Sequence, residues 1–320
     1  MRLMVVLIMV IWFTGAVFTI KIFNDCMNDG LTMEITGAGG GNNSIDGTEQ
    51  RPGIRVLDST SNKTITLLNN HFGFYFNGLD NLFVDSHGDI WFTDPDYAWN
   101  GNWTDTPPQL HAQTYRFRPS TGQVWVVEDS LGQPNGIAIS PDAKNVYICD
   151  TIAGSGTVSP HYPNIHSMPY NQTAKHTVYK YDIVDADTAP ALINKRPFDY
   201  SQEWVPDGLK VTANGVVVAG VGMGVDVIDR TGSLVLQIRT HYIVQNFAWV
   251  GEELTEFWLV RQGGISRVRW NLKVAGVEVD CFRQQYYAIC VSVKMLHDWN
   301  LHRVSFPKER PSIPILFTTC

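Results

Sequence analysis

The sequence is poor in cysteine and in charge. Its five cysteines form no Cys-x-x-Cys pair and no zinc-ligand spacing, and their odd number leaves at least one unpaired within a monomer: Cys26, Cys149, Cys281, Cys290 and Cys320. Cys149 lies in an apolar run, which predicts a small buried core residue. Charged residues make up 17% of the chain and the net charge is −7, with no long run of one sign. This composition indicates a globular core and disfavours nucleic acid, whose binding needs a basic face.

Several common motifs of enzyme sites are also absent. No Gly-x-Ser-x-Gly segment occurs, so the usual marker of a serine hydrolase is missing. The glycine-rich segment 37–41 has no lysine and no helical pattern after it, which argues against a phosphate-binding loop. His161 and His166 lie in a proline-rich loop rather than on a helix, so we expect no zinc pair there.

The N-terminus carries an uncharged apolar run from Leu3 to Ile20 after a basic start. This order is typical of a secretory signal, and the length of the run also reaches the lower limit for a membrane span. We therefore expect residues 1–24 to be a signal peptide or a membrane anchor, with a start assigned too far upstream as the third alternative. The expected location is extracellular, either secreted or anchored through an uncleaved leader. Four turn-like glycosylation sequons support it: Asn42, Asn62, Asn102 and Asn171.

A pattern of two short strands repeats along the rest of the chain. Each copy opens with an Asn or Asp and runs through an alternating apolar strand, a polar turn and a second apolar strand. Clear copies span residues 79–94, 134–150 and 206–220, and a weaker one spans 245–259. Such alternation predicts β-hairpins, and a spacing of roughly 40 to 70 residues fits the four-stranded blade of a β-propeller. A β-sandwich is the alternative, but it gives no reason for the recurring Asn or Asp.

The recurring polar residues predict one site. In a propeller the innermost strand of each blade lines the central channel, so equivalent strand ends converge on the axis. Side chains from the four hairpins are then expected to form a ring of oxygen donors: Asp80 or Asn81, Asn135, Asp207 and Asn246. Carboxylate and amide oxygens suit Ca²⁺ or Mg²⁺ and accept Mn²⁺ or Zn²⁺.

The same segments resemble the gluconolactonase and senescence-marker-protein (regucalcin) superfamily, and more closely its secreted fungal lactonohydrolase branch. The resemblance extends over roughly residues 35–272 and is carried by four segments: TLLNNHFGFYFN at 66–77, GDIWFTD at 88–94, QPNGI at 133–137 and VPDGL at 205–209. It implies a six-bladed β-propeller over residues 25–275 and a divalent cation on the axis, Ca²⁺ before the others. It also implies hydrolysis of small sugar or aldonic lactones by metal-activated water.

The resemblance implies roles for individual residues. Asn135 and Asp207 match the family's metal-binding Asn and Asp, and Asp207 is also the expected catalytic base. Asp80 is a further expected ligand, although the family's Asn-Asp pair is reversed here as Asp80-Asn81. Asn81, Asp150 and Asn246 are expected to contact substrate or support the site, and for Asp150 the capping of a turn is the favoured alternative. Five aromatic residues are weighed as walls of the channel mouth against the alternative that they belong to the core: Phe74, Tyr75, Trp91, Trp99 and Trp103.

The sequence also departs from the family pattern. The family's metal site has a Glu in the first blade, but no Glu precedes Glu34, which lies in a segment resembling a later strand. We therefore expect an incomplete first blade and weaker cation binding. Residues 276–320 lack the blade pattern and are expected to form an atypical tail. Two alternatives stay open: a catalytically inactive or truncated propeller acting as a binding protein, and a related propeller enzyme of the arylesterase or strictosidine-synthase kind.

Overall fold

The computed structural model describes residues 10–13, 16–19, 31–36, 51–58, 63–100, 104, 106–155, 170–184, 188–250, 254–261, 264–269 and 288–289. Two short helices, α1 (Tyr97–Asn100) and the 3₁₀ helix η1 (Ile152–Ser155), are the helical elements of these residues, and all other elements are strands. The prediction of an all-β fold is confirmed. No helix in the described part of the chain has the length and apolar character to span a membrane.

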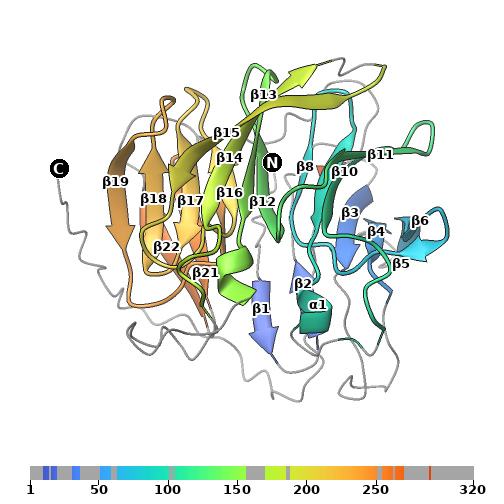
Figure 1. The fold of residues 1–320 in the computed structure, drawn as a ribbon, viewed down its shortest axis with the longest axis horizontal. Helices are drawn as coiled ribbons and strands as arrows, with labels where there is room; N and C mark the ends of the chain where they lie inside the picture. The colour runs from blue at the N-terminus through green and yellow to red at the C-terminus, as the bar shows by residue number, and fades with distance from the viewer. Residues whose placement is uncertain are drawn as a thin grey trace.

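Three four-stranded antiparallel sheets follow one another along the chain, and Figure 1 shows them from right to left. The first contains β8 (Leu82–Val84), β9 (Ile90–Asp94), β10 (Gln113–Arg118) and β11 (Gln123–Glu128). The second contains β12 (Pro134–Ile139), β13 (Asn145–Asp150), β14 (Thr177–Val184) and β15 (Ala191–Tyr200). The third contains β16 (Leu209–Val211), β17 (Val217–Val221), β18 (Gly224–Ile228) and β19 (Leu234–Arg239).

Two further sheets flank these three. One contains β20 (Asn246–Val250), β21 (Glu256–Arg261) and β22 (Gly264–Arg269). The other has the order β23-β3-β4-β5, from β23 (Ala288–Ile289), β3 (Leu31–Thr36), β4 (Gly53–Asp58) and β5 (Lys63–Leu68). Two hairpins complete the strands: β1 (Val10–Phe13) with β2 (Ala16–Thr19), and β6 (Asn70–His71) with β7 (Phe74–Tyr75).

The first strands of successive sheets lie side by side, with β12 in contact with both β8 and β16. Each sheet then runs outward strand by strand, which is the arrangement of a β-propeller. The described residues form five sheets of three or four strands, so the expected number of six blades stays a prediction. In the N-terminal sheet, β23 pairs in parallel with β3, so two residues of the predicted tail join the strands of this sheet. The signal or anchor role of residues 1–24 also stays a prediction.

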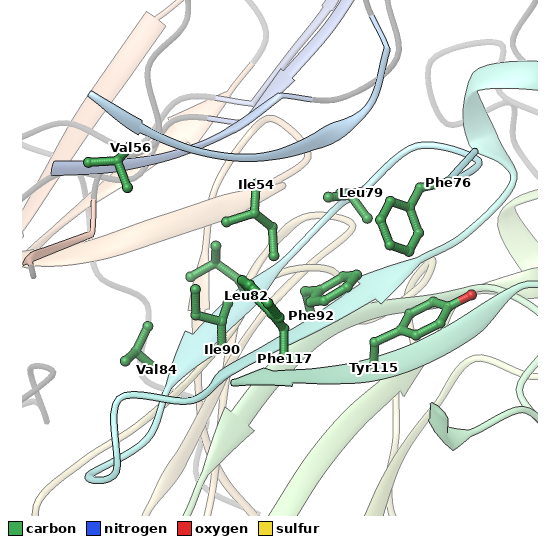
Figure 2. Packing of buried hydrophobic residues seen from close by; sticks show 10 residues of the cluster. All are labelled: Ile54, Val56, Phe76, Leu79, Leu82, Val84, Ile90, Phe92, Tyr115 and Phe117. Carbon is green, nitrogen blue, oxygen red and sulfur yellow. The ribbon is translucent and has the colours of Figure 1, made fainter. Parts of the chain in front are cut away.

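The core lies between neighbouring sheets, because strand side chains alternate between the two faces. Leu82 and Val84 of β8 pack toward the N-terminal sheet, whereas Phe83 packs toward the next sheet along the chain. Figure 2 shows the first of these layers, where Ile54 of β4 meets the aromatic group around Phe92. Each such side chain, removed from water, contributes roughly 1.5–3 kcal/mol. Packing on both faces keeps the first strands, and the polar residues at their ends, in fixed positions.

Candidate active site at the ends of the inner strands

Two buried carboxylates hold the turns that lead into the inner strands. Asp94, at the end of β9, accepts the backbone N–H groups of Asn77 at 3.1 Å and Gly78 at 2.8 Å. Asp150, at the end of β13, accepts those of Gly132 at 3.0 Å and Gln133 at 3.1 Å. The structure thus gives the expected supporting residue Asp150 a turn-capping position directly before Asn135. The same chemistry at equivalent places explains why both hairpins end in Asp.

Two glycines let the inner strands approach closely. A Cβ on Gly136 would lie 2.0 Å from the carbonyl oxygen of Asp207, and a Cβ on Gly208 would lie 2.3 Å from Oδ1 of Asn246. Both separations are far below van der Waals contact. The Asn-Gly and Asp-Gly pairs that the sequence repeats therefore have a packing reason. Because glycine has no side chain, the Asp207 carbonyl can lie beside Gly136 and the Asn246 side chain beside Gly208.

The structure brings together four of the predicted site residues in a chain of side-chain hydrogen bonds. Asn246 Nδ2 donates to Asn81 Oδ1 at 3.1 Å, although 165 residues separate them. Asn81 Nδ2 donates to Asp80 Oδ1 at 2.9 Å and to Asn135 Oδ1 at 3.0 Å. The three asparagines are buried. Since amides from three different sheets meet here, equivalent strand ends converge as the repeat predicts.

Asp207 joins the same group, and its carboxylate accepts a hydrogen bond from Asn135. Burial raises the pKa of Asp80 to about 7, an effect that its hydrogen bond from Asn81 partly offsets. Burial, together with the charge of Asp80, raises the pKa of Asp207 well above its usual range, against the smaller opposing effects of Asn135 and Lys210. Two carboxylates so placed favour either a shared proton or a bound cation.

Lys210 is a site residue that sequence reasoning missed. Its Nζ donates to Asn246 Oδ1 at 3.3 Å and to the Leu209 carbonyl at 3.0 Å, and lies 5.5 Å from the centre of the Phe247 ring. Burial lowers its pKa to about 8, while nearby Cys149 and Asp207 act in the opposite direction. The sequence signal that could have identified Lys210 is the alternation of side chains between the two faces of β16. Leu209 and Val211 are buried on one face, which leaves Lys210 on the other.

Tyr97 of α1 is a second residue that the sequence did not single out. Its hydroxyl is hydrogen-bonded to the Thr151 hydroxyl, and Asn135 donates a hydrogen bond to it. Burial raises its pKa well above the ordinary value, as do the charges of Asp80 and Asp207 to a lesser extent. Helix α1 is fixed by the preceding residue, Asp96, whose N–H donates to Gln133 Oε1 at 3.1 Å and whose carboxylate accepts from Gln133 Nε2.

The aromatic residues weighed for the channel mouth separate into different environments. Trp91 is 1% exposed, packs in the core between sheets and donates from Nε1 to Asp85 at 2.8 Å, so the core alternative holds for it. Trp99 and Tyr75 line a pocket with Arg51, whose guanidinium lies over the Tyr75 ring at 4.1 Å from its centre. Phe74 is exposed. Trp103 lies outside the described residues.

The remaining predicted residues include one cysteine and four sequons. Cys149 is buried, as predicted; it is unpaired, and its thiol donates to the Asp207 carbonyl at 3.3 Å. Asn171 is exposed in a turn, where its Oδ1 accepts from the Thr173 hydroxyl at 2.8 Å. Its glycosylation stays a prediction. The other three sequons lie outside the described residues: Asn42, Asn62 and Asn102.

The donor set of the axis fits a hard divalent cation. Asp80 and Asp207 supply carboxylate oxygens. Oδ1 of Asn81 and Oδ1 of Asn135 each accept one amide hydrogen bond and keep a second lone pair. Ca²⁺ takes such carboxylate and amide oxygens together. Within the described ranges no three His, Cys, Asp or Glu side chains gather as a metal-binding group, so cation binding here depends on the asparagines.

Known proteins are similar to this chain in sequence and in fold. Residues 47–160 match the family model described as SMP-30/Gluconolactonase/LRE-like region. Lactonohydrolase oryL of Aspergillus oryzae is 45% identical over 236 residues, covering 73% of this chain and 53% of that protein. Lactonohydrolase oryH of the same organism is 32% identical over 295 residues, covering 75% and 62%.

Two solved structures share the fold at low identity. A gluconolactonase from Xanthomonas campestris aligns with a TM-score of 0.55 at 21% identity, covering 76% of this chain and 72% of that one. Regucalcin from Agrobacterium tumefaciens, a calcium-binding protein, aligns with a TM-score of 0.52 at 13% identity, covering 76% and 68%. Both likenesses concern the fold alone.

These matches confirm the family resemblance predicted from the sequence. Residues 47–160 match the SMP-30/gluconolactonase/LRE-like region, and the two relatives from Aspergillus oryzae are named lactonohydrolases. The chain spans 53% and 62% of the length of these two relatives.

Proposed function

We propose that this protein is a lactonase that hydrolyses small sugar or aldonic lactones at the ends of its inner strands. The observation that carries the proposal is the convergence of Asp80, Asn81, Asn135, Asp207 and Asn246 from four sheets on one place. The names of the curated relatives, lactonohydrolases, agree with it. Six blades and an extracellular location, secreted or anchored, belong to the same proposal.

The proposed cofactor is a divalent cation, Ca²⁺ before Mg²⁺, Mn²⁺ or Zn²⁺, held by Asp80, Asn135 and Asp207. When bound, such a cation supplies positive charge that polarises an ester carbonyl and lowers the pKa of water beside it. The calcium-binding neighbour in the structural comparison supports a cation of this kind. Asn81 and Asn246 then act as supports, because their amides fix the orientation of Asp80 and Asn135.

The chemistry asked of the protein side chains is proton transfer. Asp207 takes a proton from the water whose oxygen attacks the lactone carbonyl carbon. The carbon–oxygen bond of the ring then breaks, and the leaving ring oxygen receives that proton, which gives the open hydroxy acid. Asn135 steadies the carboxylate by donating a hydrogen bond to it.

A catalytically inactive propeller that binds a lactone or hydroxy acid is the second candidate. One observation favours it: the ammonium of Lys210 lies beside the axis and its positive charge opposes the binding of a cation. The lactonase is preferred because two carboxylates and three asparagine amides meet at the axis.

The test is hydrolysis of a panel of aldonic and pantoyl lactones, with aryl esters beside them, by the purified protein and its Asp207→Asn variant. The exposed Asp129 supplies the matched control, Asp129→Asn. We expect lactone hydrolysis to fall by 10²-fold or more in Asp207→Asn, as for loss of a general base, and to be unchanged in the control. Full activity of Asp207→Asn would refute the assignment. Activity on aryl esters alone would refute the substrate class, and a folded protein without any activity would favour the binding protein.

A further inference from the structure

Tyr97 connects Thr151 to Asn135 through a chain of hydrogen bonds, and the donors and acceptors of its partners fix the direction of that chain. The Thr151 hydroxyl donates to the Gln133 carbonyl at 3.0 Å, and a carbonyl oxygen only accepts. The Thr151 hydroxyl proton is therefore directed to Gln133. The Tyr97 hydroxyl contacts the Thr151 hydroxyl and donates to the Thr151 carbonyl oxygen at 3.4 Å.

The direction continues from Tyr97 to Asn135. Since the Tyr97 proton points to Thr151, the phenol oxygen presents only lone pairs to its other neighbours. Asn135 donates to this oxygen through Nδ2, the one donor atom of its side chain. The amide oxygen of Asn135 must then face the opposite way, toward Asn81, whose Nδ2 lies 3.0 Å from it. Two independent contacts thus assign the same amide orientation.

From this geometry we infer that Tyr97, held by Thr151, is a positioning residue that turns Oδ1 of Asn135 toward the axis. This inference rests on the proposed function, because the oxygen so presented is one of the proposed cation ligands. A carbonyl oxygen binds a cation, whereas an amide NH₂ in the same place repels it. Without the Tyr97 acceptor, the Asn135 amide keeps its orientation through Asn81 and Asp207 alone.

Helix α1 is built to keep Tyr97 in this place. The reciprocal pair of Asp96 and Gln133 ties the start of the helix to the turn that leads into β12, the strand that carries Asn135. Asn100 Nδ2 closes the helix onto Asp96 at 2.7 Å. The residue that orients Asn135 is therefore anchored to the same turn as Asn135 itself, so the two move together.

The test is calcium binding by calorimetry to the full-length protein, comparing wild type with Tyr97→Phe. The substitution removes one oxygen and no charge, since Tyr97 is neutral, so electrostatics alone predicts no change. We expect calcium to bind about 10-fold more weakly or worse, as when a residue behind a metal ligand is lost. Thr151→Val should weaken binding in the same direction, and the double variant should be no weaker than Tyr97→Phe. Thr151→Ser, which keeps the hydroxyl, should bind as wild type does.

A matched control is Tyr200→Phe, which removes an exposed phenol on the far end of β15. Unchanged calcium affinity in Tyr97→Phe, or losses in the two single variants that multiply in the double, would overturn the relay. If the wild-type protein binds no calcium, the proposed cofactor is refuted. The hydrogen-bond relay is then tested separately, by urea unfolding in the presence of chelator. The stability losses of Tyr97→Phe and Asn135→Leu should then be less than additive, and full additivity would overturn it.

Discussion

Gly136→Ala is the substitution whose effect follows most directly from the geometry of the axis. The new methyl carbon would lie 2.0 Å from the Asp207 carbonyl oxygen and 2.9 Å from the Leu209 nitrogen. Both neighbours are backbone atoms, so no side chain can turn aside. The segment that carries Asp207 must retreat from β12 by about 1 Å or more to relieve the contact.

Two consequences can be given magnitudes. Overpacking of this kind costs about 1–3 kcal/mol, which for a domain of this size lowers the melting temperature by roughly 2–12 °C. A shift of about 1 Å in a reacting group lowers the rate by about 10²-fold. We therefore expect Gly136→Ala to lose both stability and lactone hydrolysis, with the second loss far greater than the fraction unfolded explains.

Gly154→Ala is the matched control, because a Cβ there meets its nearest neighbours, on Trp204 and Val205, at an ordinary 3.7 Å. Thermal unfolding followed by circular dichroism, with hydrolysis assays on the same samples, measures both effects. The reasoning would be refuted by a melting temperature for Gly136→Ala equal to that of Gly154→Ala, or by wild-type activity in the axis variant.

Two further predictions concern buried charges. Burial raises the pKa of Asp94 to about 7. The protein is therefore most stable, with respect to this group, below pH 4, where Asp94 is protonated in both the folded and the unfolded chain. As the pH rises through 7, the free energy of unfolding falls by about 4 kcal/mol because the buried side chain must ionise. In urea unfolding, the free energy of unfolding of Asp94→Asn should therefore rise relative to that of wild type between pH 4 and 7. A constant difference in free energy of unfolding across that range would contradict the assignment. Lys210 is charged at neutral pH although burial lowers its pKa to about 8, so Lys210→Met should stabilise the protein by about 1–2 kcal/mol at pH 7. A matched Lys144→Met at an exposed site should leave stability unchanged, and a destabilised Lys210→Met would show that its hydrogen bonds outweigh its desolvation.

The fold and the ring of polar residues could be read from sequence because both depend on a repeat. Alternating apolar residues predict hairpins wherever they occur, and a polar residue at the same place in each hairpin predicts convergence on the axis. Asp80, Asn81, Asn135, Asp207 and Asn246 meet for that reason. The position of each in its own hairpin was enough, without knowledge of the loops.

Residues that reach the site from outside the repeat could not be predicted in this way. Tyr97 stands in a four-residue helix between strands, and its direction depends on the pairing of Asp96 with Gln133 in the next sheet. Lys210 lies within an inner strand, but a lysine in a strand ordinarily points to solvent. Here its ammonium lies instead 5.5 Å from the centre of the Phe247 ring of the following sheet. Trp91 could not be assigned from the sequence either, because an aromatic residue suits both a channel mouth and a core. Its packing between two sheets in the structure places it in the core.

The central claim is that the inner strand ends form one cation-dependent hydrolytic site, and metal reconstitution tests it most directly. The protein is stripped with chelator, and lactone hydrolysis and bound metal are measured together as calcium is added back. The account predicts little hydrolysis in the stripped protein and recovery that saturates at one cation per chain, with neither binding nor recovery in Asp207→Asn. Full hydrolysis by the stripped protein, or calcium bound without any hydrolysis, would contradict it.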